Sequence, residues 1–342
     1  MSFTEILHRD LSPQPGSSTH SPARVGTGCA HGTFGELLQG SLQQDNDHFL
    51  VTLPIQRCSR AMFTPDTSSD QITVSPGHKL KSRELVQKLV DYFGHSFGGH
   101  LSIESDLPEG KGMASSSADL VATARAFESA LGHDIPTEVI LELLRTIEPT
   151  DGVMYPEFVT FFHRKVELVR RLGFPSRIKV VAIDEGGQID TIEYNQRHRV
   201  FTDQECAEYA ELLQTLETAI LGNDLALLGR VTTRSAILNQ KRNPKRHLDL
   251  MIEIGKQTGA LGVVVAHSGP CLGLMFPDEP GQQEQIEQAR CALAKLTGDV
   301  FIVESLDACT EPARPSIPPE TSDASTGGCS LDLNQSSACA GA

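Results

Sequence analysis

The sequence predicts an α+β protein, with strands concentrated in its first part and a strand–helix–strand unit near its end. Short apolar or alternating runs bounded by turn residues, which are typical of strands, lie among longer stretches whose apolar residues recur at helical spacing. The chain has 342 residues, of which 39% are hydrophobic and 21% are charged. This length and composition suit one large two-layer domain or two fused lobes with a sizeable core.

The first part contains short strands and two helices. The predicted strands are Val51–Leu53, Arg60–Phe63, Gln71–Val74 and His100–Glu104. Ser82–Phe93 is predicted to be an amphipathic helix because its apolar side chains fall on one face. A longer helix is expected over Ser115–Leu131, where apolar residues keep helical spacing until Gly132 ends the run.

The second part alternates helices with strands. The predicted helices are Thr137–Thr146, Glu157–Leu172, Asp203–Leu221, Leu225–Asn239, His247–Thr258 and Gln282–Leu296. The predicted strands are Ile178–Ile183, Gly262–Ala266, Leu272–Phe276 and Asp299–Val303. Residues 1–23 and 309–342 are predicted to be disordered, because they carry too few large apolar side chains to offset the entropy of ordering.

The charge balance excludes two classes of partner. The chain has 44 acidic and 29 basic residues, and its formal net charge is −15 at pH 7. A field of this sign repels phosphate backbones and anionic lipid, so we expect neither nucleic acid nor a membrane surface as a partner. No apolar run approaches the roughly 18–20 residues of a spanning helix, and residues 1–23 lack the apolar core of a secretion signal. We therefore expect a cytoplasmic location.

The eight cysteines predict neither a disulfide framework nor a metal site. None belongs to a Cys-x-x-Cys pair, and those in the predicted core are interpreted as small hydrophobic residues in a reducing compartment. His95 and His100 lack the spacing and the acidic partners of a zinc site.

The most informative segment is a glycine- and serine-rich loop between a predicted strand and the helix that begins at Ser115. Gly110 and Gly112 allow unusual backbone angles and leave room for a bulky anion against the main chain. The N–H groups at the start of the helix favour phosphate, and the hydroxyls of three consecutive serines can donate hydrogen bonds to it. The residues predicted to hold the phosphates are Pro108, Glu109, Gly110, Lys111, Gly112, Met113, Ala114, Ser115, Ser116 and Ser117.

Two commoner phosphate-binding loops are excluded by the order of residues. A Walker loop requires Gly-Lys-Ser/Thr, which is absent, and a dinucleotide-binding loop requires a glycine at the position of Ser115. One alternative without function remains open, in which a serine caps the helix behind a flexible turn.

Three segments, in the same order along the chain, resemble the motifs of the GHMP kinases, the family of galactokinase, homoserine kinase, mevalonate kinase and phosphomevalonate kinase. The loop resembles the second motif, Pro-x-Gly-x-Gly-Leu-Gly-Ser-Ser-Ala, with Met113 in place of Leu and Ala114 in place of the third Gly. Cys29–Gly40 resembles the first motif. Gly259–Gly262 together with Ala266–Gly273 resembles the third, glycine-rich motif. The segments Gly-Glu-Leu-Leu-Gln-Gly and Ala-His-Ser-Gly are most similar to the L-threonine kinases of cobalamin biosynthesis.

This resemblance implies a two-lobed fold with a ribosomal-protein-S5-like N-terminal lobe over residues 24–175 and a ferredoxin-like C-terminal lobe over residues 176–308. It also implies an ATP- and Mg²⁺-dependent kinase that makes O-phospho-L-threonine, with ATP and the acceptor in the cleft between the lobes. A homodimer is one possible assembly.

The resemblance assigns catalytic and metal-binding roles to few residues. Asp151 is the candidate base, because it follows the loop at about the interval found in several GHMP kinases. Glu148 is expected to complete Mg²⁺ coordination opposite Ser116. Many relatives carry a Lys or Arg in the first motif that supports the base or the transferring phosphate, and this residue is absent here. Either Lys111 supplies the missing positive charge, or catalysis relies on magnesium and helix dipoles. The alternatives are a solvated turn for Glu148–Gly152 and a surface position for Lys111.

The acceptor is expected to contact polar residues from distant segments. An amino acid needs a hydrogen-bond acceptor for its ammonium group and donors for its carboxylate. Glu36 is therefore predicted to bind the ammonium group, and Thr33 or Gln39 to contact other polar atoms of the substrate. Ser268 and Gly269 are also predicted to bind substrate, and His267–Gly269 to pack beside the phosphate loop. Arg234, Asn239 and Gln240 share the segment Thr233–Gln240 at the end of a predicted helix, and they either face the substrate or are exposed.

Three other functions stay open from the sequence. The acceptor could be homoserine, serine or a specialised metabolite. A mevalonate-diphosphate-type decarboxylase uses the same loop, but its diphosphate substrate requires several cations, of which these motifs offer few. Finally, the fold could bind ATP and a ligand without catalysis.

Overall fold

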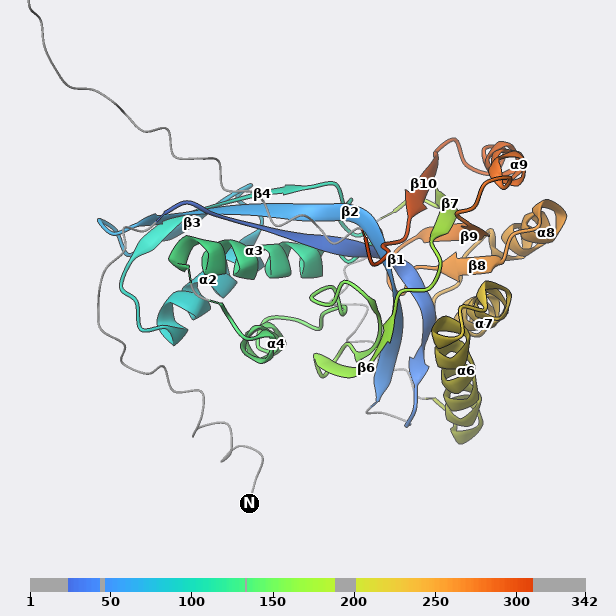
Figure 1. Cartoon of the computed structure of the whole chain (residues 1–342), viewed down its shortest axis with the longest axis horizontal. Helices are drawn as coiled ribbons and strands as arrows, with labels where there is room; N and C mark the ends of the chain where they lie inside the picture. Colours follow the sequence, from blue (N-terminus) through green and yellow to red (C-terminus); the bar gives the residue numbers. More distant parts are fainter. Residues whose placement is uncertain (1–23, 44–46, 133, 188–200, 310–342) are drawn as a thin grey trace, which may run out of the picture.

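The computed structural model describes residues 24–43, 47–132, 134–187 and 201–309 (Figure 1). Both ends predicted to be disordered lie outside the described residues, apart from position 309. Within the described part the strands form a ten-stranded sheet in the order β10-β7-β9-β8-β1-β2-β4-β3, and the β5–β6 hairpin joins it through β2. The strands are β1 (Gly26–Ser41), β2 (His48–Asp66), β3 (Ile72–Ser75), β4 (Gly98–Ser105), β5 (Phe158–Phe162), β6 (Glu167–Gly173), β7 (Ile178–Asp184), β8 (Gly262–Val265), β9 (Cys271–Pro277) and β10 (Val300–Glu304). The helices are α2 (Leu80–Tyr92), α3 (Ser115–Leu131), α4 (Thr137–Arg145), α6 (Asp203–Leu221), α7 (Leu225–Asn239), α8 (Leu248–Thr258) and α9 (Gln283–Leu293).

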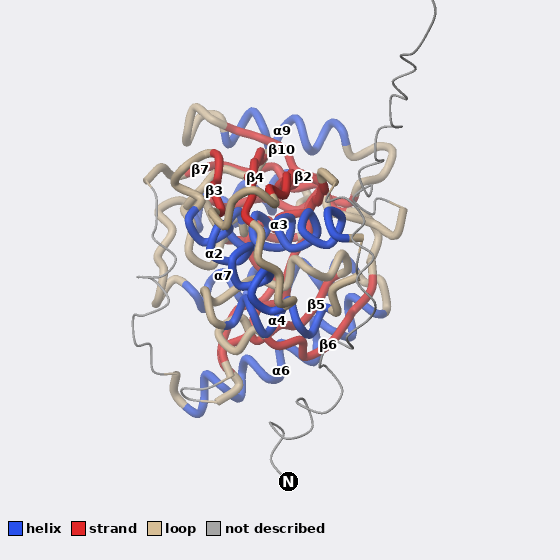
Figure 2. The backbone as a smooth tube through the Cα atoms, turned by 90° about the vertical axis from the view of Figure 1, so that its left-hand side faces the viewer, coloured by secondary structure: helices blue, strands red, loops and turns tan. Residues whose placement is uncertain are grey.

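The first part of the sheet is built on the long antiparallel pair of β1 and β2. Helix α3 approaches β1 closely because glycines face it: a Cβ at Gly26 or Gly28 would lie 2.2 Å from a carbonyl oxygen of the helix. Figures 1 and 2 show α3 between the strands β1–β4 on one side and α4 with the β5–β6 hairpin on the other. This packing fixes the N-terminus of α3, where the phosphate loop ends.

The second part continues the sheet with β8, β9, β7 and β10, on which α7, α8 and α9 pack. Its apolar cluster includes Val181, Met251, Leu274 and Phe276, which are all fully buried. Strand β1 connects the two parts: it pairs with β2 along its length and with β8 through Glu36 opposite Val265. Glu36 therefore lies where the two parts meet.

The α+β class is confirmed, and most predicted elements are present. Three helices, α3, α6 and α7, have the predicted bounds. The predicted division between residues 175 and 176 remains a prediction, because the sheet runs through both parts. Among the helices in the described ranges, none is long and apolar enough to cross a membrane.

One predicted helix, Glu157–Leu172, is wrong. This segment is the β5–β6 hairpin, in which Phe158 pairs with Gly173 and Phe162 with Glu167. The residues Phe-Val-Thr-Phe-Phe of β5 are aromatic or β-branched and favour a strand, and β5 gains a partner in β2, where Leu50 faces Phe161. Because both faces of β5 are largely buried, its apolar residues do not alternate, and this run resembled a helix.

Candidate active site

The phosphate loop connects β4 to α3 and is held by backbone contacts from two other motifs. The N–H of Thr33 donates to the carbonyl of Met113 at 3.2 Å, and the N–H of Gly35 donates to that of Gly112 at 3.2 Å. On the opposite side, a Cβ at Gly269 would lie 2.1 Å from the carbonyl carbon and oxygen of Lys111. The prediction that the His267–Gly269 segment packs beside the loop is thus confirmed.

The structure at the start of α3 distinguishes the two interpretations of the loop serines, phosphate binding and helix capping. Ala114 is the N-cap residue, and the helix has no side-chain cap hydrogen bond. The serine hydroxyls contact other partners: Ser116 donates to Glu148, and Ser117 accepts from the N–H of Asp151. The alternative of a serine-capped helix is therefore wrong. No side chain caps the first N–H groups of α3. A helix start that binds an anion needs such N–H groups.

Ala114 has a left-handed backbone, with φ of 56°, at the position where the family motif has its third glycine. A residue with a Cβ is less stable there than glycine by about 1–2 kcal/mol, and the greater freedom of glycine in the unfolded chain returns about half of this. We expect Ala114→Gly to raise the free energy of unfolding by roughly 0.5–1 kcal/mol, measured by urea unfolding. A decrease would show that the methyl group makes stabilising contacts that outweigh the strain.

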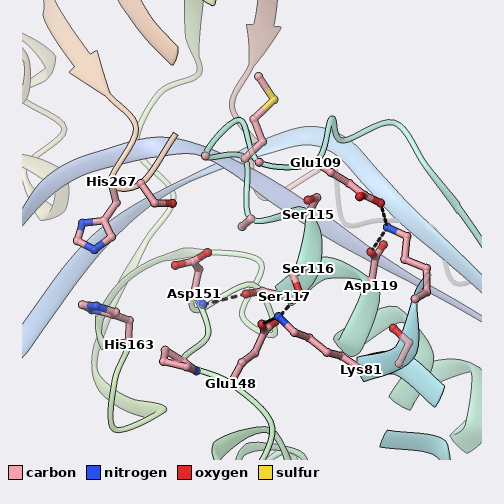
Figure 3. Close-up of a pocket in the computed structure, with 18 of the residues that line it drawn as sticks. Lys81, Glu109, Ser115, Ser116, Ser117, Asp119, Glu148, Asp151, His163 and His267 are labelled. Atoms are coloured by element: carbon pink, nitrogen blue, oxygen red, sulfur yellow. Dashed lines mark hydrogen bonds and ion pairs between the residues drawn. The ribbon is translucent and has the colours of Figure 1, made fainter. Parts of the chain in front are cut away.

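The loop forms one wall of a cavity of about 430 Å³. Figure 3 shows its other walls: the beginning of α2, the segment around Glu148–Asp151, and His163 with His267. Of the predicted site residues, the cavity is lined by Glu36, Glu109, Gly110, Gly112, Met113, Ala114, Ser115, Ser116, Ser117, Glu148, Asp151 and Ser268. Pro108, Lys111, Thr33, Gln39 and Gly269 do not line it.

Glu148 and Ser116 meet in the wall of this cavity (Figure 3). The Ser116 hydroxyl donates to Glu148 Oε1 at 2.5 Å, and Lys81 forms an ion pair with the other carboxylate oxygen. Mg²⁺ prefers oxygen ligands and is usually held by one or two protein groups together with substrate phosphates. A hydroxyl and a buried carboxylate next to a phosphate loop fit that requirement, although Lys81 must then release Glu148.

Asp151 lies between the loop serines and the two histidines, with its carboxylate directed into the cavity (Figure 3). Burial and the nearby charge of Glu148 raise the pKa of this carboxyl to about 7, while the Ser117 hydroxyl opposes the shift. Burial and the charge of Asp151 also raise the pKa of Glu36 well above its usual value. Two carboxyl groups that resist ionisation therefore face the same end of the cavity.

Positive charge reaches the cavity from residues that sequence reasoning missed. Lys79 pairs with Glu109 of the loop at 2.5 Å and with Asp119 of α3 at 2.6 Å, and Lys81 holds Glu148. Lys111, the predicted cation, instead pairs with Asp184 at 2.6 Å, and the structure does not bring it to the cavity. The sequence feature that could have indicated these lysines is Lys79-Leu80-Lys81 at the start of an amphipathic helix. The same feature is typical of a solvent-exposed helix end.

Comparison with known proteins agrees with this geometry. The family model of the GHMP kinases N-terminal domain matches residues 81–155, which include the loop, Glu148 and Asp151. The family model of the GHMP kinases C-terminal region matches residues 210–295. The L-threonine kinase of Citrobacter freundii is 28% identical over 252 residues, covering 71% of this chain and 83% of that protein. The L-threonine kinase of Salmonella typhimurium is 29% identical over 253 residues, covering 71% and 80%.

Solved structures share the fold. Homoserine kinase from Cytophaga hutchinsonii superposes with a TM-score of 0.67 at 14% identity, covering 85% of this chain and 98% of that one. Mevalonate kinase from L. major, solved in complex with R-mevalonate, gives a TM-score of 0.59 at 16% identity, covering 86% and 99%. The GHMP kinase fold is therefore confirmed, and this chain carries both a GHMP kinase N-terminal domain and a GHMP kinase C-terminal domain.

Proposed function

We propose that this protein transfers the γ-phosphoryl group of ATP to the hydroxyl of a small amino acid, with L-threonine as the substrate and O-phospho-L-threonine as the product. The observation that carries the proposal is the pair of Glu36 and Asp151, two carboxyl groups at the end of a cavity whose other walls are built for phosphate. The similarity to two L-threonine kinases supports this choice of acceptor.

The phosphate half of the cavity positions the nucleotide. The N–H groups at the start of α3 and the glycine-rich backbone face the phosphates, and Lys79 and Lys81 offset their charge. Ser116 and Glu148 would hold Mg²⁺, which supplies further charge neutralisation when bound. Since phosphoryl transfer depends mainly on positioning and charge stabilisation, these groups account for most of the chemistry.

The acceptor half orients and deprotonates the hydroxyl. The ammonium group of the amino acid would bind Glu36, where a positive charge compensates the cost of burying the carboxylate. The hydroxyl would then lie next to Asp151. Its oxygen attacks the γ-phosphorus, its proton passes to the Asp151 carboxylate, and the bond from the γ-phosphorus to the bridging oxygen breaks to release ADP.

The pKa of Asp151 sets a predicted pH dependence. The base must be ionised, and its pKa is about 7, so acidification below this value protonates it. We expect kcat/KM for L-threonine to rise about tenfold per pH unit below pH 7 and to level off above it. Initial rates of ADP release between pH 5.5 and 9 will measure this. A profile already flat at pH 5.5 would exclude a base with this pKa.

The direct test is a screen for ADP release with purified protein, ATP, Mg²⁺ and a panel of amino acids and alcohols. We expect turnover with L-threonine, and comparison with L-serine and L-homoserine will rank the hydroxy amino acids. ³¹P NMR of the product will identify a phosphate ester. Background ADP release with all three amino acids would overturn the proposed function, and turnover of a non-amino-acid alcohol would replace it with another small-molecule kinase activity.

A further inference from the structure

Two β-bulges in β1 place three buried polar side chains on one face of that strand. Thr33 pairs with Pro54, Glu36 with Thr52 and Gln39 with Leu50, so each step of three residues in β1 matches two residues in β2. Because side chains alternate with each ladder position, Thr33, Glu36 and Gln39 face the same side. Among the described residues, none is a hydrogen-bond partner for one buried atom of each side chain: Thr33 Oγ1, Glu36 Oε2 and Gln39 Nε2.

A second, small cavity of about 20 Å³ lies beside the first, and His267 lines both. It is lined by Gln39, Gly40, His48, Arg164, Phe201, Tyr209, Asn239, Arg242 and His267. This volume admits one water molecule or one carboxylate oxygen. Among the described residues that line it, there is no Asp or Glu, whereas two are arginines. Glu205 pairs with Arg242 at 2.9 Å and offsets part of this charge, so what the cavity can hold depends on the hydrogen-bond donors around it.

The unpartnered groups around this cavity are hydrogen-bond donors. Gln39 Oε1 lies 2.7 Å from His267 Nδ1, so the amide oxygen is engaged and Nε2 has no acceptor. Asn239, the last residue of α7, also leaves its Nδ2 without a partner. The two side chains are only 3% and 4% exposed, and Nη1 of Arg242 lacks a partner as well. Buried donors require an acceptor, and the residues that the structure describes supply none to these three atoms.

We propose that this small cavity binds the α-carboxylate of the amino acid acceptor, with the Gln39 and Asn239 amides as donors. The inference rests on the proposed function and extends it to a requirement for the free carboxylate. Gln39 lies two ladder positions from Glu36, roughly 7 Å along the strand. An amino acid can therefore place its ammonium group on Glu36 and its carboxylate toward Gln39, with its hydroxyl at Asp151.

The test compares L-threonine with L-threoninamide, which keeps the ammonium and hydroxyl groups but lacks the negative charge. With saturating ATP and Mg²⁺, we expect kcat/KM for L-threonine to exceed that for the amide by at least about 100-fold in the wild type. Asn239→Asp replaces a donor by a carboxylate of the same shape. This repels the carboxylate of threonine and accepts a hydrogen bond from the amide, so the ratio should fall at least about tenfold, mainly through KM.

Gln39→Glu, on β1, also replaces an amide donor of the cavity by a carboxylate. It replaces Asn239→Asp in the test if circular dichroism and thermal melting show that Asn239→Asp does not fold. Gln214→Glu, an exposed position on α6, is the matched charge control and should keep the wild-type ratio. A wild-type ratio near one, or a ratio unchanged in both cavity variants, overturns the carboxylate site and leaves the cavity to water. Background turnover of L-threonine, L-serine and L-homoserine alike overturns the proposed function and this inference together.

Discussion

Asp151→Asn is expected to lower kcat for L-threonine by about 10²–10⁴-fold, the range typical for loss of a general base. Asparagine preserves the shape of the side chain but cannot accept the proton of the attacking hydroxyl. The neighbouring Ser117 contact uses the backbone N–H of residue 151, so the substitution leaves that hydrogen bond in place. Binding of ATP, measured by calorimetry with a non-hydrolysable analogue, should stay close to the wild-type value, because the phosphate loop is untouched.

The pH profile gives this substitution a second readout. If any slow activity remains in Asp151→Asn, it should lose the rise through pH 7, since the group responsible is gone. Asp91→Asn is the matched control, because Asp91 is an exposed carboxylate on α2 that accepts a hydrogen bond from Gln87. Retention of more than about a tenth of the wild-type kcat in Asp151→Asn would exclude Asp151 as the base. A protein that binds ATP normally but shows no turnover even in the wild type would be a ligand-binding relative rather than a kinase.

Most of the predicted site residues that are close together in sequence line the cavity. The loop from Glu109 to Ser117 follows from its glycines and serines, and the structure shows the helix start and the left-handed backbone that these residues imply. Glu148 and Asp151 were reached through the family resemblance, and both line the cavity next to the loop. Local backbone requirements leave a clear mark on sequence, because few residue types satisfy them.

The parts that depend on tertiary pairing were not predictable in the same way. Strand β1 was missed as an element, because its bulges and buried polar side chains break the alternation that marks a strand. The same bulges make Thr33, Glu36 and Gln39 neighbours on one face at a spacing of three. Lys111 adjoins the loop in sequence but pairs with Asp184, while Lys79 reaches it from 30 residues upstream of Glu109. Proximity to the loop in sequence was a poor guide to which lysine lines the cavity.

The other large expected effect tests the support of the phosphate loop from the third motif. Gly269→Ala would place a Cβ 2.1 Å from the carbonyl of Lys111 and 2.3 Å from the nitrogen of Gly112. These are backbone atoms, so the contact can be relieved only by moving the loop or the His267–Gly269 segment. Such overpacking costs about 1–3 kcal/mol. We expect a lower melting temperature and a KM for ATP raised by about tenfold or more, which corresponds to about 1.4 kcal/mol of binding.

Gly298→Ala is the control for this prediction, because a Cβ there meets no atom within 4 Å and melting and KM should not change. Measuring KM well below the melting temperature separates the effect on the loop from unfolding. A variant with a lower melting temperature but wild-type ATP binding would show that the His267–Gly269 segment moves and the loop stays in place. The two substitutions should then act on different constants, because Gly269→Ala displaces the phosphate half of the cavity and Asp151→Asn disables only its acceptor half. Loss of ATP affinity in both would contradict this separation and place the nucleotide across the acceptor end.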